Sequence, residues 1–435
     1  MNFANSKKYN RKLHRVIPGG AHTYAKGEDQ YPEGMAPVIA RGKGAHVWDV
    51  DNNEFIEYGM GLRAVTLGHA YDPVIEAAYH QSKLGNNFVR PSATELEAAE
   101  ILLDMLPYAE MVKFGKNGSD VTSAAVRLAR AYTGREYIAV CENHPFFSVD
   151  DWFIATTPMS AGIPRQIADL VKTFRYNDIA SVEQLFSENP GKIACLMMEP
   201  EKNDPPENNF LHKTREICHR NGALFVLDEM ITGFRWDNGG GQNFHKVDPD
   251  LSSFGKALGN GFSVSALTGK KEIMQLGGYD HQKERVFLLS LTHGAESPSL
   301  AAAIATMRVY KSEPVVKRLW AAGRMLRENL EKSIRENDLE GYIGIFGREC
   351  CLVFGTADND KKPSQGFRTL LLQELIKHGV LAPSLIVSYS HTDEDLEKTC
   401  SAFNEAFKVY RKALRDGLDG YLKGRPVKPV FRKFG

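Results

Sequence analysis

Residues 224–229 read Leu-Phe-Val-Leu-Asp-Glu, a short apolar run that ends in two carboxylates. An apolar run of this length between breaks predicts a buried strand. Burying a carboxylate without a partner is costly, and in open α/β sheets ligands bind at the carboxyl ends of the strands. We therefore expect Asp228 to face a ligand site. In the alternative interpretation, Asp228 only caps the helix that follows.

Short apolar runs alternate with helical patterns on both sides of this predicted strand, from about residue 95 to about residue 310. Short apolar runs occur at Met111–Phe114, Tyr137–Cys141, Ile193–Met198 and Leu224–Leu227. Helical patterns separate them at Glu95–Leu106, Ser119–Tyr132 and Leu211–Asn221. Alternation of this kind predicts an α/β fold, with a mostly parallel sheet that has helices on both faces.

The two ends of the chain have a different pattern. Near the start, 45–50 and 54–58 predict a hairpin around Asp51-Asn52-Asn53. Towards the other end we expect helices at 299–310, 314–337, 373–378 and 393–414, and strands at 341–354 and 385–390. We predict a large domain over 61–310 and a smaller α+β domain built from 1–60 and 311–435.

Composition narrows the class of protein. Lys+Arg and Asp+Glu both number 54 in 435 residues, so the zero balance gives no reason to expect nucleic acid as a partner. No apolar run approaches the ~20 residues of a membrane helix, and the N-terminal sequence has no secretory pattern. The six cysteines form no CxxC motif. We expect reduced thiols, a cytoplasmic location, no bound metal and no membrane partner.

A lysine follows the next predicted strand, in the sequence Phe254-Gly255-Lys256-Ala257-Leu258. The glycines of Gly259-Asn260-Gly261, directly after it, let the backbone approach a ligand closely. A lysine in a partly dry site can act as a nucleophilic amine. Its alternative interpretation is an ordinary surface lysine. Pairing with Asp228, at the end of the preceding predicted strand, favours the chemical role.

A possible anion site lies at Gly115-Lys116-Asn117-Gly118-Ser119, between a strand and a helix. Free backbone N–H groups at a helix start, together with the Ser119 hydroxyl, suit a phosphate. We expect this helix to bury Ala124, Ala125, Leu128 and Ala129. The loop is neither a P-loop nor a dinucleotide GxGxxG motif, which disfavours a dehydrogenase.

A lysine amine, a carboxylate for a ring nitrogen and a phosphate loop together meet the needs of pyridoxal 5'-phosphate (PLP). The chain resembles the class III, fold-type I aminotransferases, and within them glutamate-1-semialdehyde 2,1-aminomutase and its relatives. The resemblance is carried by DEMITGFRW (228–236), PDLSSFGKALGNG (249–261) and TGK (268–270). Further matches are IPGG (17–20), LGHA (67–70) and NGSDVTSAAVRLARAYTGRE (117–136).

The resemblance implies roles for individual residues. Lys256 would form the Schiff base and move the α-proton, and Asp228 would pair with the pyridine nitrogen. Gly118 and Ser119 would bind phosphate, and Met230 would lie beneath the ring. Thr292 would reach the phosphate of a neighbouring subunit's cofactor, which implies a homodimer with shared active sites. Phe146 is our choice for the residue that stacks on the ring, with Phe147 as the alternative; both can also be ordinary core residues.

One departure concerns the substrates, a small-molecule amino donor and a carbonyl acceptor. The aminomutase pattern has an arginine shortly after Pro-Gly-Gly, whereas residues 21–27 here are Ala-His-Thr-Tyr-Ala-Lys-Gly. His22, Tyr24 and Lys26 suit hydroxyls or a phosphate, so we expect an aminotransferase that acts on a sugar or a small phosphorylated or carbonyl compound. Arg63 is a further candidate substrate contact. The alternatives are the aminomutase itself, a PLP-dependent racemase or decarboxylase, and a non-catalytic protein that retains the fold.

Overall fold

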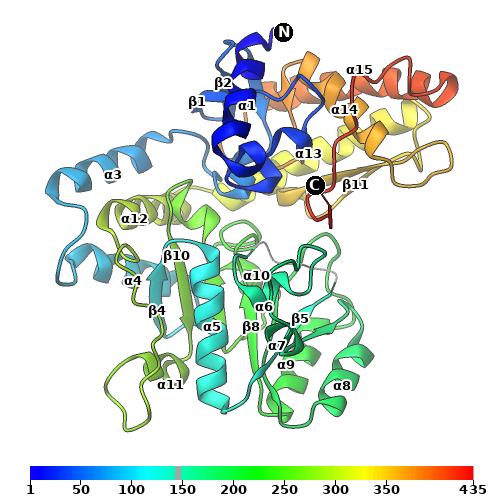
Figure 1. Ribbon diagram of the computed structural model, residues 1–435. Coiled ribbons are helices and arrows are strands. Elements are labelled where there is room, and N and C mark those ends of the chain that lie inside the picture. The colour runs from blue at the N-terminus through cyan, green and yellow to red at the C-terminus, as the bar shows by residue number, and fades with distance from the viewer. Residues whose placement is uncertain (143–147, 435) are drawn as a thin grey trace. The chain divides into compact units, whose positions relative to one another are not determined.

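The computed structural model of the chain describes residues 1–142 and 148–434, and a seven-stranded sheet lies at the centre of its middle part (Figure 1). The strands, in sheet order, are β4 (Met111–Gly115), β10 (Ser265–Gly269), β9 (Leu251–Phe254), β8 (Leu224–Asp228), β7 (Ile193–Met198), β5 (Tyr137–Cys141) and β6 (Val171–Phe174). Neighbours run parallel except around β10, which is antiparallel to β4 and to β9. The predicted mostly parallel α/β sheet is confirmed.

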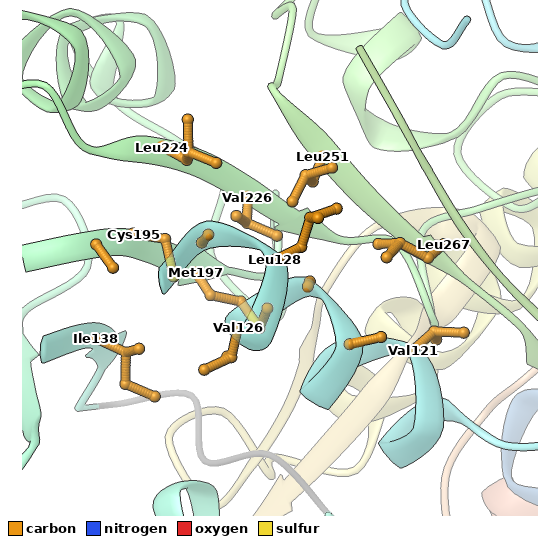
Figure 2. Packing of buried hydrophobic residues seen from close by; sticks show 14 of the residues in the cluster. Val121, Val126, Leu128, Ile138, Cys195, Met197, Leu224, Val226, Leu251 and Leu267 are labelled. Atoms are coloured by element: carbon orange, nitrogen blue, oxygen red, sulfur yellow. The ribbon is translucent and has the colours of Figure 1, made fainter. Parts of the chain in front are cut away.

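Both faces of this sheet are buried, because its strands alternate between two apolar clusters. Val226 belongs to the cluster beneath α5 (Gly118–Thr133), while its neighbours Phe225 and Leu227 belong to the cluster on the other face. Figure 2 shows Val121 and Leu128 of α5 packed against side chains of the central strands. The predicted buried residues Ala124, Ala125, Leu128 and Ala129 are all at most 2% exposed. On the opposite face, α8 (Ile179–Glu188) and α9 (Phe210–Arg220) supply the apolar contacts.

The remaining helices of this part connect or flank the strands. They are α3 (Asp72–Leu84), α4 (Ala93–Met105), α6 (Asp151–Ile154), α7 (Arg165–Asp169), α10 (Gly240–Phe244), α11 (Lys271–Met274) and α12 (Ser297–Ser312). No helix in the two described ranges combines the length and the apolar character that a membrane crossing needs. All six cysteines lie in these ranges and are free thiols.

The chain divides into two units, and the sheet above belongs to the unit Asp72–Val316. The other unit contains Met1–Tyr71 and Lys317–Arg432. Its sheet has the order β1 (Ile39–Lys43), β2 (His46–Asp49), β3 (Glu54–Glu57) and β13 (Val380–Leu381). Strands β2 and β3 form the predicted hairpin, and β13 pairs with β3 in parallel. The smaller domain is therefore built from both ends of the chain, as predicted.

This part of the chain also contains four helices of 13 residues or more. They are α1 (Ala4–Val16), α13 (Val315–Glu336), α14 (Gln365–Lys377) and α15 (Asp393–Asp416), and a separate hairpin joins β11 (Ile343–Phe346) to β12 (Val353–Thr356). The prediction of a strand over 385–390 is wrong. The N–H groups of Leu385, Ile386 and Tyr389 donate to Leu352, Tyr58 and Thr66, which lie in three separate segments. This apolar stretch is buried, but no single partner strand runs beside it.

Candidate active site

Asp228 is the last residue of β8, and its side chain is buried. Its Oδ1 accepts hydrogen bonds from the Met230 N–H at 2.9 Å and from the Ser253 hydroxyl at 3.0 Å. Burial, and then the nearby Glu199 carboxylate, raise the pKa of Asp228 to about 6, although the Lys256 charge and the two hydrogen bonds oppose the rise. The next helix, α10, begins at Gly240. Asp228 therefore does not cap it, and that interpretation is wrong.

Lys256 follows β9 after the single residue Gly255, at the start of a one-turn 3-10 helix, Lys256–Gly259. Strands β8 and β9 are parallel neighbours in which Asp228 lies opposite Ser253, so Lys256 emerges at the same sheet edge as Asp228. The side chain is half-buried, and φ is +44°. A left-handed backbone is costly for a residue with a Cβ, and strain of this kind concentrates at functional sites.

Helix α5 begins beside the same edge, directly after the loop that leaves β4. Asn117 and Asp120 form a capping box, in which the Asp120 carboxylate accepts the Asn117 N–H at 3.0 Å. Two serines hold the loop: Ser263 Oγ donates to the Lys116 carbonyl and Ser265 Oγ to the Asn117 carbonyl, each at 2.9 Å. The N–H groups of Gly118 and Ser119 are in the first turn of a 16-residue helix, where no intrahelical acceptor exists.

A second hydroxyl lies beside Ser119. Ser148 Oγ is 3.2 Å from Ser119 Oγ, which also accepts the Val149 N–H at 3.2 Å. The start of α5 thus presents two serine hydroxyls and the positive end of a helix dipole. These are the groups that bind a phosphate.

Met230 lies between the α5 start and the lysine loop. A Cβ atom on Gly118 would lie 3.2 Å from Met230 Sδ, and one on Gly255 would lie 2.6 Å from it. Glycine at both positions therefore lets the Met230 side chain lie close to the two backbone segments. The contacts bring together the three segments singled out in the sequence: the acidic strand end, the lysine loop and the helix start.

Glu229, the second carboxylate after β8, points away from this chemistry and is fully buried. It accepts hydrogen bonds from the N–H groups of Gly241 and Gln242, at 2.7 and 2.6 Å, and from the Thr232 hydroxyl. Burial raises the pKa of Glu229 to about 7, against these bonds. Its role is to hold the start of α10.

Thr292 lies in an exposed loop, which precedes α12. Its carbonyl accepts a hydrogen bond from Asn87 Nδ2 at 2.8 Å, and the Asn86 carbonyl accepts the Ser297 N–H at 2.8 Å. A Cβ on Gly294 would lie 3.3 Å from the Phe114 carbonyl of β4. The loop is therefore anchored to this unit, while the Thr292 side chain is accessible in the single chain.

The candidate substrate residues belong to the other unit. His22, Tyr24 and Lys26 are all exposed. Arg63 ends α2 (Met60–Arg63), a turn in which all four residues have a left-handed φ, between +42° and +73°. Arg63 Nε donates to Cys351 Sγ at 3.4 Å. Phe146 and its alternative Phe147 lie outside the described residues.

Sequence reasoning missed the groups that support the site. Ser253 holds Asp228, Ser263 and Ser265 hold the helix start, Glu199 raises the pKa of Asp228, and Ser148 meets Ser119. A serine within a predicted strand does not by itself indicate that it supports a functional site. The carboxylate of Glu199, directly after the apolar β7, resembles the pattern at Asp228 and is the one signal that was available.

These residues fit PLP. The buried Asp228 carboxylate, whose pKa burial raises to about 6, suits a protonated ring nitrogen. The α5 start suits the phosphate, and a half-buried amine lies at the neighbouring strand end. Fold and site together define a fold-type I PLP-dependent enzyme.

Comparison with known proteins defines the family. The family model of class III aminotransferases (Aminotransferase class-III) matches residues 28–407, and the chain belongs to this family. It is a PLP-dependent enzyme of the aminotransferase and aminomutase type, so the non-catalytic alternative is wrong.

Curated relatives and solved structures agree. The chain is 30% identical to glutamate-1-semialdehyde 2,1-aminomutase of Sulfurihydrogenibium azorense, over 94% of this chain and all of the relative. The FumI protein of Sphingopyxis sp. MTA144, solved in its PLP internal aldimine form, has a TM-score of 0.87 and 28% identity, covering 97% of this chain and 98% of that one. An omega-transaminase from Sphaerobacter thermophilus has a TM-score of 0.84 and 26% identity, with 93% and 97% covered.

Proposed function

We propose that this enzyme transfers an amino group from a small amine to a carbonyl acceptor, a sugar or a small phosphorylated or carbonyl compound, with Lys256 and Asp228 as its catalytic residues. The observation that supports the reaction is the placement of Lys256 and Asp228 at adjacent strand ends beside the α5 start. PLP, when bound, supplies an aldehyde that condenses with amines and a ring that withdraws electrons from the substrate.

The protein groups have separate tasks in this proposal. Lys256 Nζ would hold the cofactor, and as a free amine it would take the proton from the substrate carbon and return it. The Asp228 carboxylate keeps a positive charge at the ring nitrogen. Gly118 and Ser119 bind the phosphate, with Ser148 as an additional hydroxyl, and Met230 packs against the ring. We assign the stacking face to Phe146.

The choice of acceptor rests on residues 21–27. Their polar side chains His22, Tyr24 and Lys26 are exposed and offer single hydrogen bonds, whereas a carboxylate is best held by the planar fork of an arginine. We keep Arg63, whose Nε donates to Cys351 Sγ at 3.4 Å, as a further candidate substrate contact. We propose an acceptor that has hydroxyl or phosphate groups in place of an α-carboxylate.

Glutamate 1-semialdehyde is therefore expected to be a poor substrate of the purified enzyme. Two charge-assisted hydrogen bonds from an arginine contribute about 1.5–3 kcal/mol each, and their loss also removes orientation. A panel of acceptors, followed by the cofactor spectrum and by product analysis, tests this expectation. A kcat/KM for 5-aminolevulinate formation that exceeds the values for sugar and phosphorylated acceptors would overturn it.

The second candidate is the aminomutase itself, an intramolecular amino transfer. It is favoured by the 30% identity to the Sulfurihydrogenibium azorense aminomutase over the whole length of that relative. Turnover without an added amino donor distinguishes the two candidates, because a mutase converts a single substrate and needs no separate donor.

The proposed active unit is a homodimer. Apolar side chains are exposed on α3, on the segment after it and on the loop before Thr292: Ile75, Tyr79, Leu84, Phe88, Val89 and Leu291. Val89 is 99% exposed. An apolar surface of this kind marks an interaction site, and a second copy of the chain would cover it while placing Thr292 near the partner's phosphate.

Mixing Thr292→Ala with Lys256→Ala subunits is expected to restore activity. If Thr292 acts across subunits, each hybrid dimer has one intact site, and about a quarter of all sites recover after full exchange of a 1:1 mixture. Activity at limiting PLP measures this, because loss of one charge-assisted hydrogen bond weakens cofactor binding by about 10- to 100-fold.

Thr292→Ser, which retains the hydroxyl, is the matched control and should bind PLP like the wild type. Each variant alone sets the baseline, and mass-tagged subunits report exchange. Proven exchange without recovered activity would show that Thr292 acts within its own chain or not at all.

A further inference from the structure

The segment that holds His22, Tyr24 and Lys26 has little structure of its own. It consists of three one-turn 3-10 helices, Pro18–Gly20, Tyr24–Lys26 and Glu28–Gln30, with no buried residue in any of them. Helices this short have one or two internal hydrogen bonds and no apolar face to bury. Contacts from elsewhere in the chain must therefore set the position of this segment.

Residues 423–432, which we call the strap, contact the last of these three turns, Glu28–Gln30. The strap is first anchored on α14: the Lys423 N–H donates to Gln373 Oε1 at 2.9 Å, and the Val427 N–H donates to Thr369 Oγ1 at 2.8 Å. Thr369 and Gln373 are one turn apart on α14, and both are fully buried. One end of the strap is thus fixed to a rigid element.

From this anchor the strap reaches the turn Glu28–Gln30. The Lys428 N–H donates to the Asp29 carbonyl at 3.0 Å, and the Lys428 carbonyl accepts from Gln30 Nε2 at 3.0 Å. Arg432 Nη2 forms an ion pair with the Asp29 carboxylate. Main chain and side chain of Asp29 are therefore both held.

Arg425 adds a second point of attachment. Its N–H donates to Glu33 Oε2 at 2.9 Å, and its Nη2 donates to the Glu28 carbonyl at 3.2 Å. On the far side of the same turn, His14 of α1 contacts Glu28 Oε2 at 3.0 Å. The turn lies between the strap and α1, two residues after Lys26.

We propose that the strap positions His22, Tyr24 and Lys26, with Arg432 as the principal positioning residue for the acceptor. This inference rests on the proposed function, since it takes these three residues as acceptor contacts. The strap lies outside residues 28–407, the part matched by the family model.

The test compares Arg432→Gln with Lys428→Gln in the PLP-loaded enzyme. Each variant removes one positive charge from the strap, but the contacts of Lys428 to Asp29 and Gln30 use only its main chain. Limited trypsin digestion, with mass spectrometry of the fragment that ends at Lys26, reports the local order of the segment. We expect cleavage after Lys26 to rise about threefold or more in Arg432→Gln and to stay unchanged in Lys428→Gln.

Kinetics supply the second readout. Arg432→Gln should raise KM for the acceptor about threefold or more. The rate of the single-turnover reaction with the amino donor should not change. Arg432→Lys, which retains the positive charge, should have a KM for the acceptor close to that of the wild type. Unchanged cleavage after Lys26 in Arg432→Gln would overturn the proposal. So would a second result, in which Arg432→Gln raises cleavage but leaves KM for the acceptor unchanged, although Lys26→Ala raises that KM. If variants of His22, Tyr24 and Lys26 leave KM unchanged, the assignment of acceptor contacts fails instead, whatever the cleavage shows.

Discussion

Asp228→Asn is expected to fold like the wild type and to lose at least two orders of magnitude in kcat. The amide retains the size of the carboxylate, and its Oδ1 can still accept hydrogen bonds from Met230 and Ser253. It cannot stabilise a positive charge at the ring nitrogen, and positioned electrostatic groups of this kind contribute about 10²- to 10³-fold. Steady-state rates of the PLP-loaded variant, with circular dichroism as the check on folding, measure the effect.

Glu229→Gln is the matched control, because Glu229 is the adjacent buried carboxylate and holds only protein groups. Glu229→Gln should lower the free energy of unfolding but should leave kcat of the folded enzyme nearly unchanged. Turnover of Asp228→Asn close to the wild-type value would show that the carboxylate is structural.

The same variant has a second signature, in protein stripped of its cofactor. The folded-state pKa of Asp228 is raised from 3.8 to about 6, so the folded protein binds this proton more tightly than the unfolded chain. The contribution of protonated Asp228 to stability is therefore fully present below pH ~3.8 and is lost as the pH rises through about 6. Asp228→Asn should remove this part of the pH dependence, about 3 kcal/mol at most. Chemical denaturation at pH 5 and pH 8 compares the two proteins.

The sequence predicted those parts of the site that lie directly after a predicted strand. An apolar run ending in a carboxylate, and a glycine-flanked lysine after the next run, each give a residue at a strand end. The carboxyl ends of parallel strands meet at one edge, so Asp228 and Lys256 could be placed together before the sheet was seen. The start of α5 followed from the same logic.

Contacts that depend on strand order could not be predicted in this way. Ser265 reaches the Asn117 carbonyl only because the antiparallel β10 lies next to β4, although the two strands are far apart in the chain. Residues 385–390 show the opposite failure: their composition predicts a strand, but a strand exists only where a partner runs beside it. Pairing is a tertiary property, and a single sequence does not display it.

The balance of charge at the sheet edge connects these observations to function. Burial and Glu199 both raise the pKa of Asp228, and the Lys256 ammonium only partly opposes them. A bound cofactor with a protonated ring nitrogen would place a positive charge beside the Asp228 carboxylate. Such a charge would oppose the rise that burial and Glu199 cause in the pKa of Asp228.

Lys256 is expected to be the one lysine that borohydride labels with the cofactor. Borohydride reduces the C=N bond between a lysine amine and an aldehyde, which makes the attachment permanent. Peptide mapping should find the cofactor on the peptide that contains Lys256, at the edge shared with Asp228. Lys256→Ala should still bind PLP through the α5 start, but should lose its turnover, because both the attachment point and the base for the substrate proton are removed.

Lys271→Ala provides the comparison, since Lys271 is an exposed lysine at the start of α11 in the same unit. It should retain both labelling and turnover. Alanine at position 256 still has a Cβ in the left-handed region, where φ is +44°, so the backbone strain persists and the loss isolates the amine. Label on another lysine, or substantial turnover in Lys256→Ala, would remove the basis for the proposed chemistry, because no other part of the proposal supplies a base at the reacting carbon.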